Sequence, residues 1–251
     1  MKSELGWMIY YDMGLQIIEI KGTGMMILEF LHCVRKVIRF VFCGAAIGLF
    51  YVIIGTTTIQ PAFAEQPPVL LVLGDSLVAG HGLPQGMAFP DVLDQMLKQV
   101  GVDVRMINAG VSGDTTAGGL ARVDWSLADN PNAVIIVLGG NDLLRGLDPA
   151  TSYSNLDKII DRFKAGNVGV LLAGMQAPRN FGSDYADEFD AIYQDLAQRH
   201  KVLFYPFFLD GVALQPTMNQ PDGMHPNKDG VKHIAAQILP FVRSLLTKIA
   251  Q

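Results

Sequence analysis

The chain has 251 residues, of which 50% are hydrophobic and 9% aromatic, and it contains 26 glycines. This is the composition of an ordinary globular protein, and it excludes a disordered or a fibrous chain. The formal net charge is −5, so the chain lacks the basic excess that neutralises phosphates, and we expect no nucleic-acid partner.

The first 64 residues have the order of a signal peptide. Three basic residues between positions 35 and 39 precede an apolar run at 40–54, and a polar spacer leads to an Ala-Phe-Ala triplet that ends at Ala64. This order predicts cleavage after Ala64 and a periplasmic or secreted protein without a stable membrane anchor. The alternative is an uncleaved leader that anchors the protein, although the apolar run is shorter than the roughly 20 residues of a spanning helix.

The leader also holds features that the rest of the chain then lacks. Both cysteines, Cys33 and Cys43, lie in it, so neither a disulfide nor a cysteine nucleophile is expected after it. The leader contains five of the 19 basic and four of the 24 acidic residues, so 14 basic and 20 acidic residues follow it, with a net charge of −6.

The sequence changes character near Met25 and Met26, which indicates an over-long gene start. Residues 65–251 show no repeat and no low-complexity tract, so we predict one domain there.

Five short apolar runs alternate with helical patterns after the leader. The runs predict strands at Val69–Gly74, Val102–Ile107, Ala133–Leu138, Val168–Ala173 and Val202–Phe207. The helical patterns cover about Phe89–Val100, Thr116–Ala128, Ser152–Ala165, Asp184–His200 and Lys228–Ile249. Strict alternation of this kind predicts right-handed crossovers and a three-layer α/β/α sandwich around a five-stranded parallel sheet. Ligands then bind beyond the carboxyl ends of the strands.

A serine and a base are predicted to meet at that edge of the sheet. Ser76 follows the first strand in a Gly-Asp-Ser sequence, and a nucleophilic serine needs a base that a third group orients. Asp222 stands three residues before His225 with a D-G turn between them, and Pro226 keeps the histidine out of a helix. Asn227 is expected to cap the last helix and to hold this loop. Taken alone, each of Ser76, Asp222 and His225 is explained equally well by a place in a turn. Taken together, they predict a nucleophile, the acid that orients the base, and the base.

Two loops supply candidate donors for an oxyanion. Gly113 follows the second strand and can present its N–H closely because it has no side chain. Asn141 follows the third strand after two glycines and offers a side-chain NH₂. With the Ser76 N–H, three donors are expected to converge where the negative charge of a tetrahedral intermediate develops. Asp75 and Asp114, beside the site, are expected to support the loops.

These residues lie in four blocks that resemble those of the SGNH/GDSL hydrolases in order and spacing. The blocks are GDS at 74–76, Gly113, GGND at 139–142 and DxxH at 222–225. The phrases LGDSLVAGHGL, NAGVSGDTTAGGLAR, LGGNDLLRG and DGMHPN look most similar to the bacterial periplasmic acyl-CoA thioesterase I, lysophospholipase and arylesterase group. The resemblance covers essentially all of the chain after the leader, and it implies the flavodoxin-like fold of that family.

The resemblance further implies a role for each matching residue. Ser76 is the nucleophile, Asp222 and His225 complete the triad, and Gly113 and Asn141 join the Ser76 N–H as oxyanion donors. The implied reaction is hydrolysis of carboxylic esters or acyl thioesters, such as aryl esters, acyl-CoA or lysophospholipids, through an acyl-enzyme and without a cofactor. We expect small-molecule substrates and a monomer.

The substrate is predicted less sharply than the reaction. An apolar groove for the acyl chain is expected from Leu143, Leu144, Met175 and Pro178, and the loop around Pro178 varies with substrate in such enzymes. One alternative is a carbohydrate O-deacetylase with the same triad. Another is a non-catalytic module that binds a ligand at the edge of the sheet.

Four further patterns do not indicate catalytic, metal-binding or cofactor-binding residues. His81 lies in a Gly-His-Gly sequence soon after Ser76, which fits a rim or substrate contact better than a base. His200 and His233 lack a suitably spaced carboxylate or cysteine, so no metal site is expected. The glycines near His81 do not match a dinucleotide fingerprint, because the third is one residue late and a proline interrupts the helix start. The GxSxG elbow of α/β-hydrolases is not found at Ser76.

Overall fold

A five-stranded parallel sheet forms the centre of residues 66–251, the part of the chain that the computed structural model describes. The strands are ordered β2-β1-β3-β4-β5 and span β1 Val69–Gly74, β2 Arg105–Gly110, β3 Ala133–Val137, β4 Gly169–Ala173 and β5 Leu203–Tyr205. The predicted leader, its cleavage site and both cysteines lie outside the described residues.

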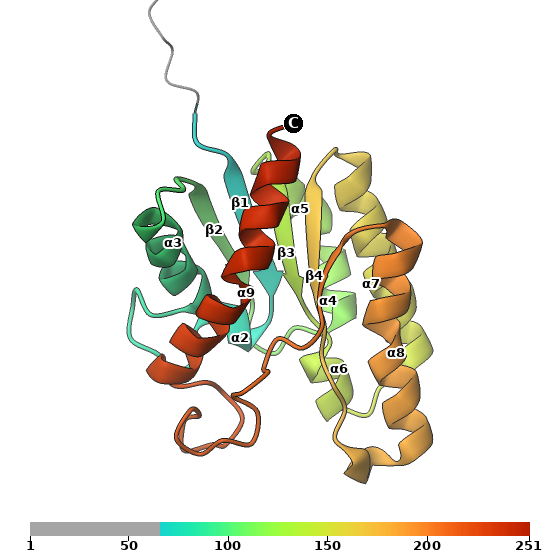
Figure 1. The fold of residues 1–251 in the computed structure, drawn as a ribbon. Helices are drawn as coiled ribbons and strands as arrows, with labels where there is room; N and C mark the ends of the chain where they lie inside the picture. Colours follow the sequence, from blue (N-terminus) through green and yellow to red (C-terminus); the bar gives the residue numbers. More distant parts are fainter. Residues whose placement is uncertain (1–65) are drawn as a thin grey trace, which may run out of the picture. The chain divides into compact units, whose positions relative to one another are not determined.

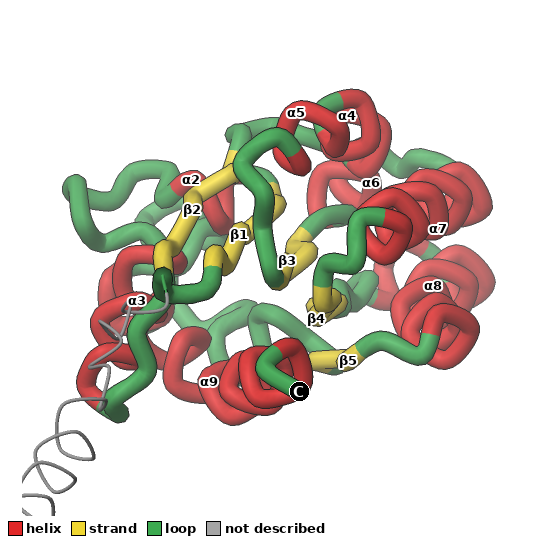
Figure 2. Tube along the Cα trace, turned by 90° about the horizontal axis from the view of Figure 1, so that it is seen from above, coloured by secondary structure: helices red, strands yellow, loops and turns green. Residues whose placement is uncertain are grey.

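Helices cover both faces of this sheet, which confirms the predicted three-layer α/β/α sandwich. Figure 2 shows α3 and α9 on one face and α4, α5, α7 and α8 on the other. The long helices are α3 Phe89–Gln99, α7 Pro149–Ala165, α8 Ser183–His200 and α9 Lys228–Ile249. The short ones are α2 Ser76–Ala79, α4 Thr116–Ala121, α5 Val123–Leu127, α6 Gly140–Leu144 and the 3₁₀ turn η1 Arg179–Phe181.

The central strands are apolar on both faces because both faces are covered. All five residues of β3 and the run Leu70–Leu73 of β1 are fully buried. The backbone N–H and C=O groups of these strands are paired in the parallel register, with Leu70 opposite Met106 and Ala133. A rigid, dry centre therefore holds the strand ends from which the polar loops leave.

Two predicted boundaries are wrong for reasons that lie in the turns. The second strand begins at Arg105 rather than Val102, because Val102 still closes the end of α3 by donating its N–H to the Leu97 carbonyl. Gly101 makes this turn at φ +76°. The single helix expected over 116–128 is two helices, α4 and α5, that break at Arg122 with φ −113° and ψ 8°.

Other differences concern short elements and the start of one long helix. Helices α2 and α6 were not predicted, because four or five residues carry too little periodicity to be recognised. Helix α7 begins at Pro149, three residues before the predicted start, because Asp148 caps it and proline suits its first position. Strand β5 has only three residues. Within residues 66–251, none of the helices combines the length and the apolar character needed to cross a membrane.

Candidate active site

Four polar segments meet at the carboxyl edge of the sheet, at the lower end of the molecule as drawn in Figure 1. They follow β1, β2 and β3, or precede α9. Because all five strands are parallel, their carboxyl ends lie at one edge, and residues far apart in the sequence reach one another there.

Ser76 sits at the first position of α2, directly beyond β1. Asp75 caps this helix by accepting a 3.0 Å hydrogen bond from the Leu77 N–H. Gly74 has no room for a side chain, since a Cβ there would lie 2.3 Å from Val78 Cγ2 and 2.7 Å from the Val137 carbonyl oxygen. The Gly-Asp-Ser sequence thus provides a tight strand end, a helix cap and a hydroxyl at the wall of the cavity in three consecutive residues.

The loop before α9 brings His225 to this hydroxyl. His225 Nε2 lies 2.9 Å from Ser76 Oγ, and His225 Nδ1 lies 2.7 Å from Asp222 Oδ2. The other carboxylate oxygen, Asp222 Oδ1, accepts the backbone N–H groups of Met224 and His225 at 2.9 and 3.0 Å. These hydrogen bonds hold the Asp222 pKa well below its usual range, first those from the His225 and Met224 N–H groups and then that from the imidazole.

Two further side chains fix the position of this loop. Asn227 caps α9 by accepting the N–H groups of Asp229 and Gly230, as the sequence predicts. Gln220 donates from Nε2 to the His81 and Pro226 carbonyls at 2.7 and 3.0 Å. Its backbone N–H also donates to the His225 carbonyl at 2.8 Å. Sequence reasoning missed Gln220, because its partner His81 is 139 residues away.

The three predicted oxyanion donors lie around the same cavity as Ser76 and His225. The Ser76 N–H is at the first position of a helix, where an N–H has no partner within the helix. Gly113 adopts φ +86°, which glycine alone tolerates readily. Asn141 comes from α6, and its Nδ2 donates to Asp75 Oδ2 at 3.1 Å.

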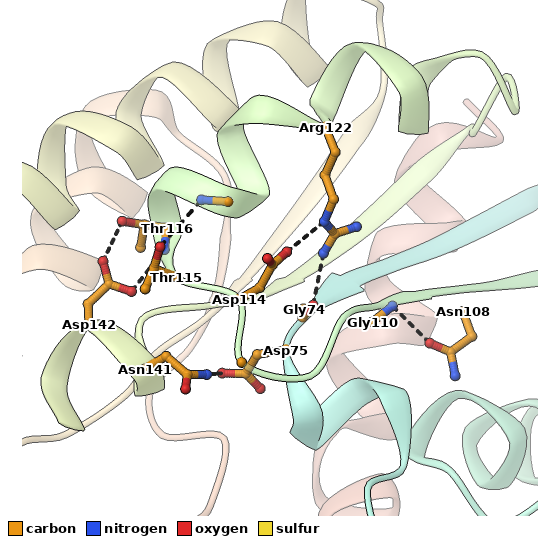
Figure 3. A network of polar contacts seen from close by, with 12 residues as sticks. Gly74, Asp75, Asn108, Gly110, Asp114, Thr115, Thr116, Arg122, Asn141 and Asp142 are labelled. Atoms are coloured by element: carbon orange, nitrogen blue, oxygen red, sulfur yellow. Dashed lines mark hydrogen bonds and ion pairs between the residues drawn. The ribbon is translucent and has the colours of Figure 1, made fainter. Parts of the chain in front are cut away.

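A network of buried polar groups underlies these donors (Figure 3). Asp142, 1% exposed, accepts hydrogen bonds from the Thr116 N–H and Oγ1 and from Ser152 Oγ at 2.8, 2.6 and 3.1 Å. Arg122 pairs with Asp114 at 2.7 Å and donates to the Gly74 carbonyl at 2.9 Å. Asp114 therefore supports its loop through a salt bridge. The network ties the loops after β1, β2 and β3 together.

A cavity of about 670 Å³ opens beside Ser76. The four predicted groove residues all line it: Leu143, Leu144, Met175 and Pro178. Sequence reasoning missed the apolar residues that the segment between β5 and α9 adds, among them Phe207, Leu209, Leu214 and Met224. That segment has no regular periodicity that could have indicated them.

The other histidines occupy different surroundings. His81 lines the cavity, and its ring lies 4.6 Å from that of His225, which agrees with a rim position. His200 does have a carboxylate partner, since its Nε2 lies 2.6 Å from Asp157 Oδ1 on the neighbouring helix α7. This contact could not be predicted from the sequence, because it joins two different helices. Residues 66–251 contain no cluster of three or more side chains able to hold a metal ion.

A serine, a histidine and an aspartate in one hydrogen-bonded series, beside N–H donors at the edge of a parallel sheet, have the geometry of a serine hydrolase site. Comparison with known proteins agrees with this class. The model of the GDSL-like lipase/acylhydrolase family matches residues 72–233, and the chain belongs to that family. The resemblance recognised in the sequence is thereby confirmed.

Individual relatives are similar over most of their own length. The arylesterase of Vibrio mimicus is 42% identical over 175 residues, which cover 69% of this chain and 88% of the relative. Thioesterase 1/protease 1/lysophospholipase L1 of Escherichia coli K12 is 39% identical, covering 71% and 87%. The crystal structure of TesA is 40% identical with a TM-score of 0.68, and the match covers 70% of this chain and 99% of that one.

Proposed function

We propose that this protein hydrolyses carboxylic esters and acyl thioesters through an acyl-enzyme formed on Ser76. The observation that carries the proposal is the series Ser76 Oγ, His225 Nε2 and Asp222 Oδ2, with distances of 2.9 and 2.7 Å, at the wall of an apolar cavity. Membership of the lipase/acylhydrolase family and the esterase and thioesterase relatives support the same reaction.

In the first half of the reaction, His225 Nε2 takes the proton of Ser76 Oγ as that oxygen attacks the carbonyl carbon. The negative charge passes to the carbonyl oxygen, where the N–H groups of Ser76 and Gly113 and the Asn141 amide stabilise it. The lowered pKa of Asp222 keeps this carboxylate ionised beside the imidazolium that forms. His225 then gives its proton to the leaving alcohol or thiol.

The second half repeats these steps with water. His225 removes a proton from a water molecule, the resulting hydroxide attacks the acyl-enzyme carbonyl, and the same donors stabilise the second oxyanion. The collapse of this intermediate returns the proton to Ser76 and releases the carboxylic acid. No metal or redox step is needed for this balance, because every proton moves between Ser76, His225, the leaving group and water.

The substrates that we propose are esters and thioesters with an apolar acyl chain: aryl esters, acyl-CoA and lysophospholipids. A cavity of about 670 Å³ lies within the range of ligand sites that bury a small molecule. Leu143 and Met175 are almost fully buried in its wall and Leu144 is half exposed at its rim, so an acyl chain would replace water against carbon. An acetyl group would leave most of this apolar wall without a contact, which disfavours the O-deacetylase alternative.

The proposed nucleophile is tested by labelling and turnover together. A fluorophosphonate probe should label the purified wild-type protein at Ser76, as located by peptide mapping, and the protein should hydrolyse p-nitrophenyl esters. The Ser76→Ala variant should fold normally, remain unlabelled and lose turnover. A folded wild-type protein that shows neither labelling nor hydrolysis would favour the binding-module alternative instead.

The acyl groove is tested by chain length. Rates for p-nitrophenyl esters from acetyl to long acyl chains should rise with length and then fall. Enlarging a wall residue, as in Leu143→Phe, should move the optimum to shorter chains. An optimum at acetyl that is unmoved by this change would contradict the proposed groove and support the deacetylase.

We also propose that the protein is exported to the periplasm as a monomer, with its leader cleaved after Ala64. The support is the order of basic residues, apolar run and Ala-Phe-Ala triplet in the sequence. Amino-terminal sequencing of the protein recovered from the periplasmic fraction should begin at Glu65. Recovery of the intact chain with the membrane fraction would favour the anchored alternative.

A further inference from the structure

Asp75 is an unusual residue to bury next to a nucleophile. Its side chain is 1% exposed, and within residues 66–251 it forms no ion pair with a basic side chain. Burial of a carboxylate without a cation is costly. Here burial raises the pKa of Asp75 to about 6, although the hydrogen bonds from Leu77 and Asn141 oppose the shift. Burial of the ionised Asp75 side chain therefore costs the folded state free energy.

Helix capping alone does not explain the choice of an acid. The cap uses one oxygen, Oδ1, which accepts the Leu77 N–H at 3.0 Å. Serine and asparagine cap helices about as well as aspartate. What the acid adds is a second acceptor, Oδ2, and that oxygen receives a 3.1 Å hydrogen bond from Asn141 Nδ2 (Figure 3).

This second contact decides which end of the Asn141 amide faces Asp75. A primary amide is a donor at one end and an acceptor at the other, and a half-turn about its last torsion exchanges the two. An ionised carboxylate is only an acceptor, so the NH₂ must face it. One of the two N–H bonds is then used, and the other remains available to the cavity. Asp75 also lies close under the start of α6, since a Cβ on Gly140 would be 3.3 Å from Asp75 Oδ2.

The backbone of Asn141 is fixed by a separate set of contacts. The next residue, Asp142, is held by the Thr116 N–H, Thr116 Oγ1 and Ser152 Oγ. Helix α6 is therefore attached to α4 and α7 whatever Asp75 does. The remaining freedom of Asn141 lies in its side chain, and Asp75 removes that freedom.

We propose that Asp75 is a positioning residue, which turns the Asn141 amide so that its NH₂ serves as an oxyanion donor. The inference rests on the proposed function, because it requires Asn141 to face a developing negative charge. It also explains why an acid is buried here: its negative charge excludes the flipped amide. The titratable groups near the Asp75 carboxyl are His225, whose charge favours the ionised form, and the fully buried Tyr193.

The test compares variants that preserve the cap and change only the second acceptor. Asp75→Asn can keep one oxygen on the Leu77 N–H but then presents an NH₂ to the NH₂ of Asn141. Asp75→Ser keeps the cap and leaves no second acceptor. With p-nitrophenyl esters, both variants should lower kcat by about 10- to 100-fold and change KM by less than about twofold, since an oxyanion donor acts on the transition state. The melting temperature of Asp75→Asn at pH 8 should be no lower than that of the wild type.

A double-mutant cycle with Asn141→Ala locates the effect. Loss of one oxyanion donor costs about 10²- to 10³-fold in kcat. If Asp75 acts through Asn141, the change Asp75→Asn should cost less than about threefold in the Asn141→Ala background. Multiplicative losses in the double variant would overturn the proposal, and so would a wild-type kcat in Asp75→Asn. A lower melting temperature with a raised KM would also overturn it, since it would indicate a general loss of structure.

The proposed function fails in a different way. A wild-type protein without ester hydrolysis, or a Ser76→Ala variant that keeps it, would refute the acyl-enzyme on Ser76 before any Asp75 variant is compared. The proposed role of Asp75 is tested only when the wild type is active and the Ser76→Ala variant is inactive.

Discussion

The two sides of the candidate active site are built in opposite ways. On the base side, Asp222 reaches the His225 ring and backbone within three residues, and its side chain is 41% exposed. On the oxyanion side, Asn141 depends on Asp75, 66 residues away, and Asp142 depends on Thr116, 26 residues away, and both acids are 1% exposed. A local, solvated loop therefore positions the base, whereas buried contacts between distant loops position the donors. The difference predicts that a change at the exposed Asp222 lowers mainly activity, whereas a change at the buried Asp142 lowers mainly stability.

The largest expected effect is on activity at the base side. Asp222→Asn removes the charge that stabilises the imidazolium and allows the wrong His225 tautomer. We expect kcat to fall by about 10⁴-fold, as for the equivalent change in other triads. The melting temperature should change little, because the side chain is substantially exposed. Steady-state kinetics and thermal unfolding of the same preparation check both parts. Substantial unfolding of this variant would show that the loop also supports the domain.

The matched change on the oxyanion side should act on stability. Asp142→Asn keeps the shape of the side chain but places an NH₂ where a carboxylate oxygen accepts hydrogen bonds from Thr116 or Ser152. Loss of a buried acceptor from such a network costs about 2–4 kcal/mol. Urea unfolding should show this as a lower midpoint with an unchanged slope. If the variant were as stable as Asp222→Asn, the two sides would not differ as we argue.

The same contrast explains what the sequence could and could not predict. The sequence predicted the triad of Ser76, Asp222 and His225, because a strand end and a local Asp-Gly-Met-His turn can both be recognised from the order of the residues. Gly113 and Asn141 were predicted as donors. Asp75 and Asp114 were predicted to support the loops, but their contacts and those of Asp142 were not predicted, since the partners lie on other elements and only the fold brings them together.

The fold was predicted to a similar degree. Buried strands and long helices carry strong apolar patterns, so the layers and the sheet followed from the sequence. Two of the errors lie at Val102 and Arg122, where the turn after α3 and the break between α4 and α5 interrupt the pattern. Arg122 reaches Asp114 and the Gly74 carbonyl from the break between α4 and α5, so the break is part of the support of the site.

Folding stability is expected to depend on pH through Asp75. Its pKa is raised from 3.8 to about 6 in the folded protein, so the folded state binds the proton more tightly than the unfolded state. Stability contributed by this group is therefore greatest below about pH 4 and is lost as pH rises to about 6. The difference between the pKa values of the unfolded and the folded state corresponds to up to about 3 kcal/mol of folding stability. The free energy of unfolding of the wild type minus that of Asp75→Asn should fall across this window. A flat difference would contradict the raised pKa.

The smallest expected effect comes from Gln220, which joins the loop of His81 to the loop of His225. Gln220→Ala removes hydrogen bonds to the His81 and Pro226 carbonyls, worth about 1 kcal/mol together in a partly exposed place. The Asp222–His225 pair is built locally and should survive, so kcat should fall by only a few-fold. Gln220→Glu is the matched control, because it keeps the size of the side chain and removes the donor. Similar small losses of kcat in both variants would support a loop that is held by the Gln220 hydrogen bonds. A loss of kcat that approaches that of Asp222→Asn would mean that the position of His225 depends on distant contacts.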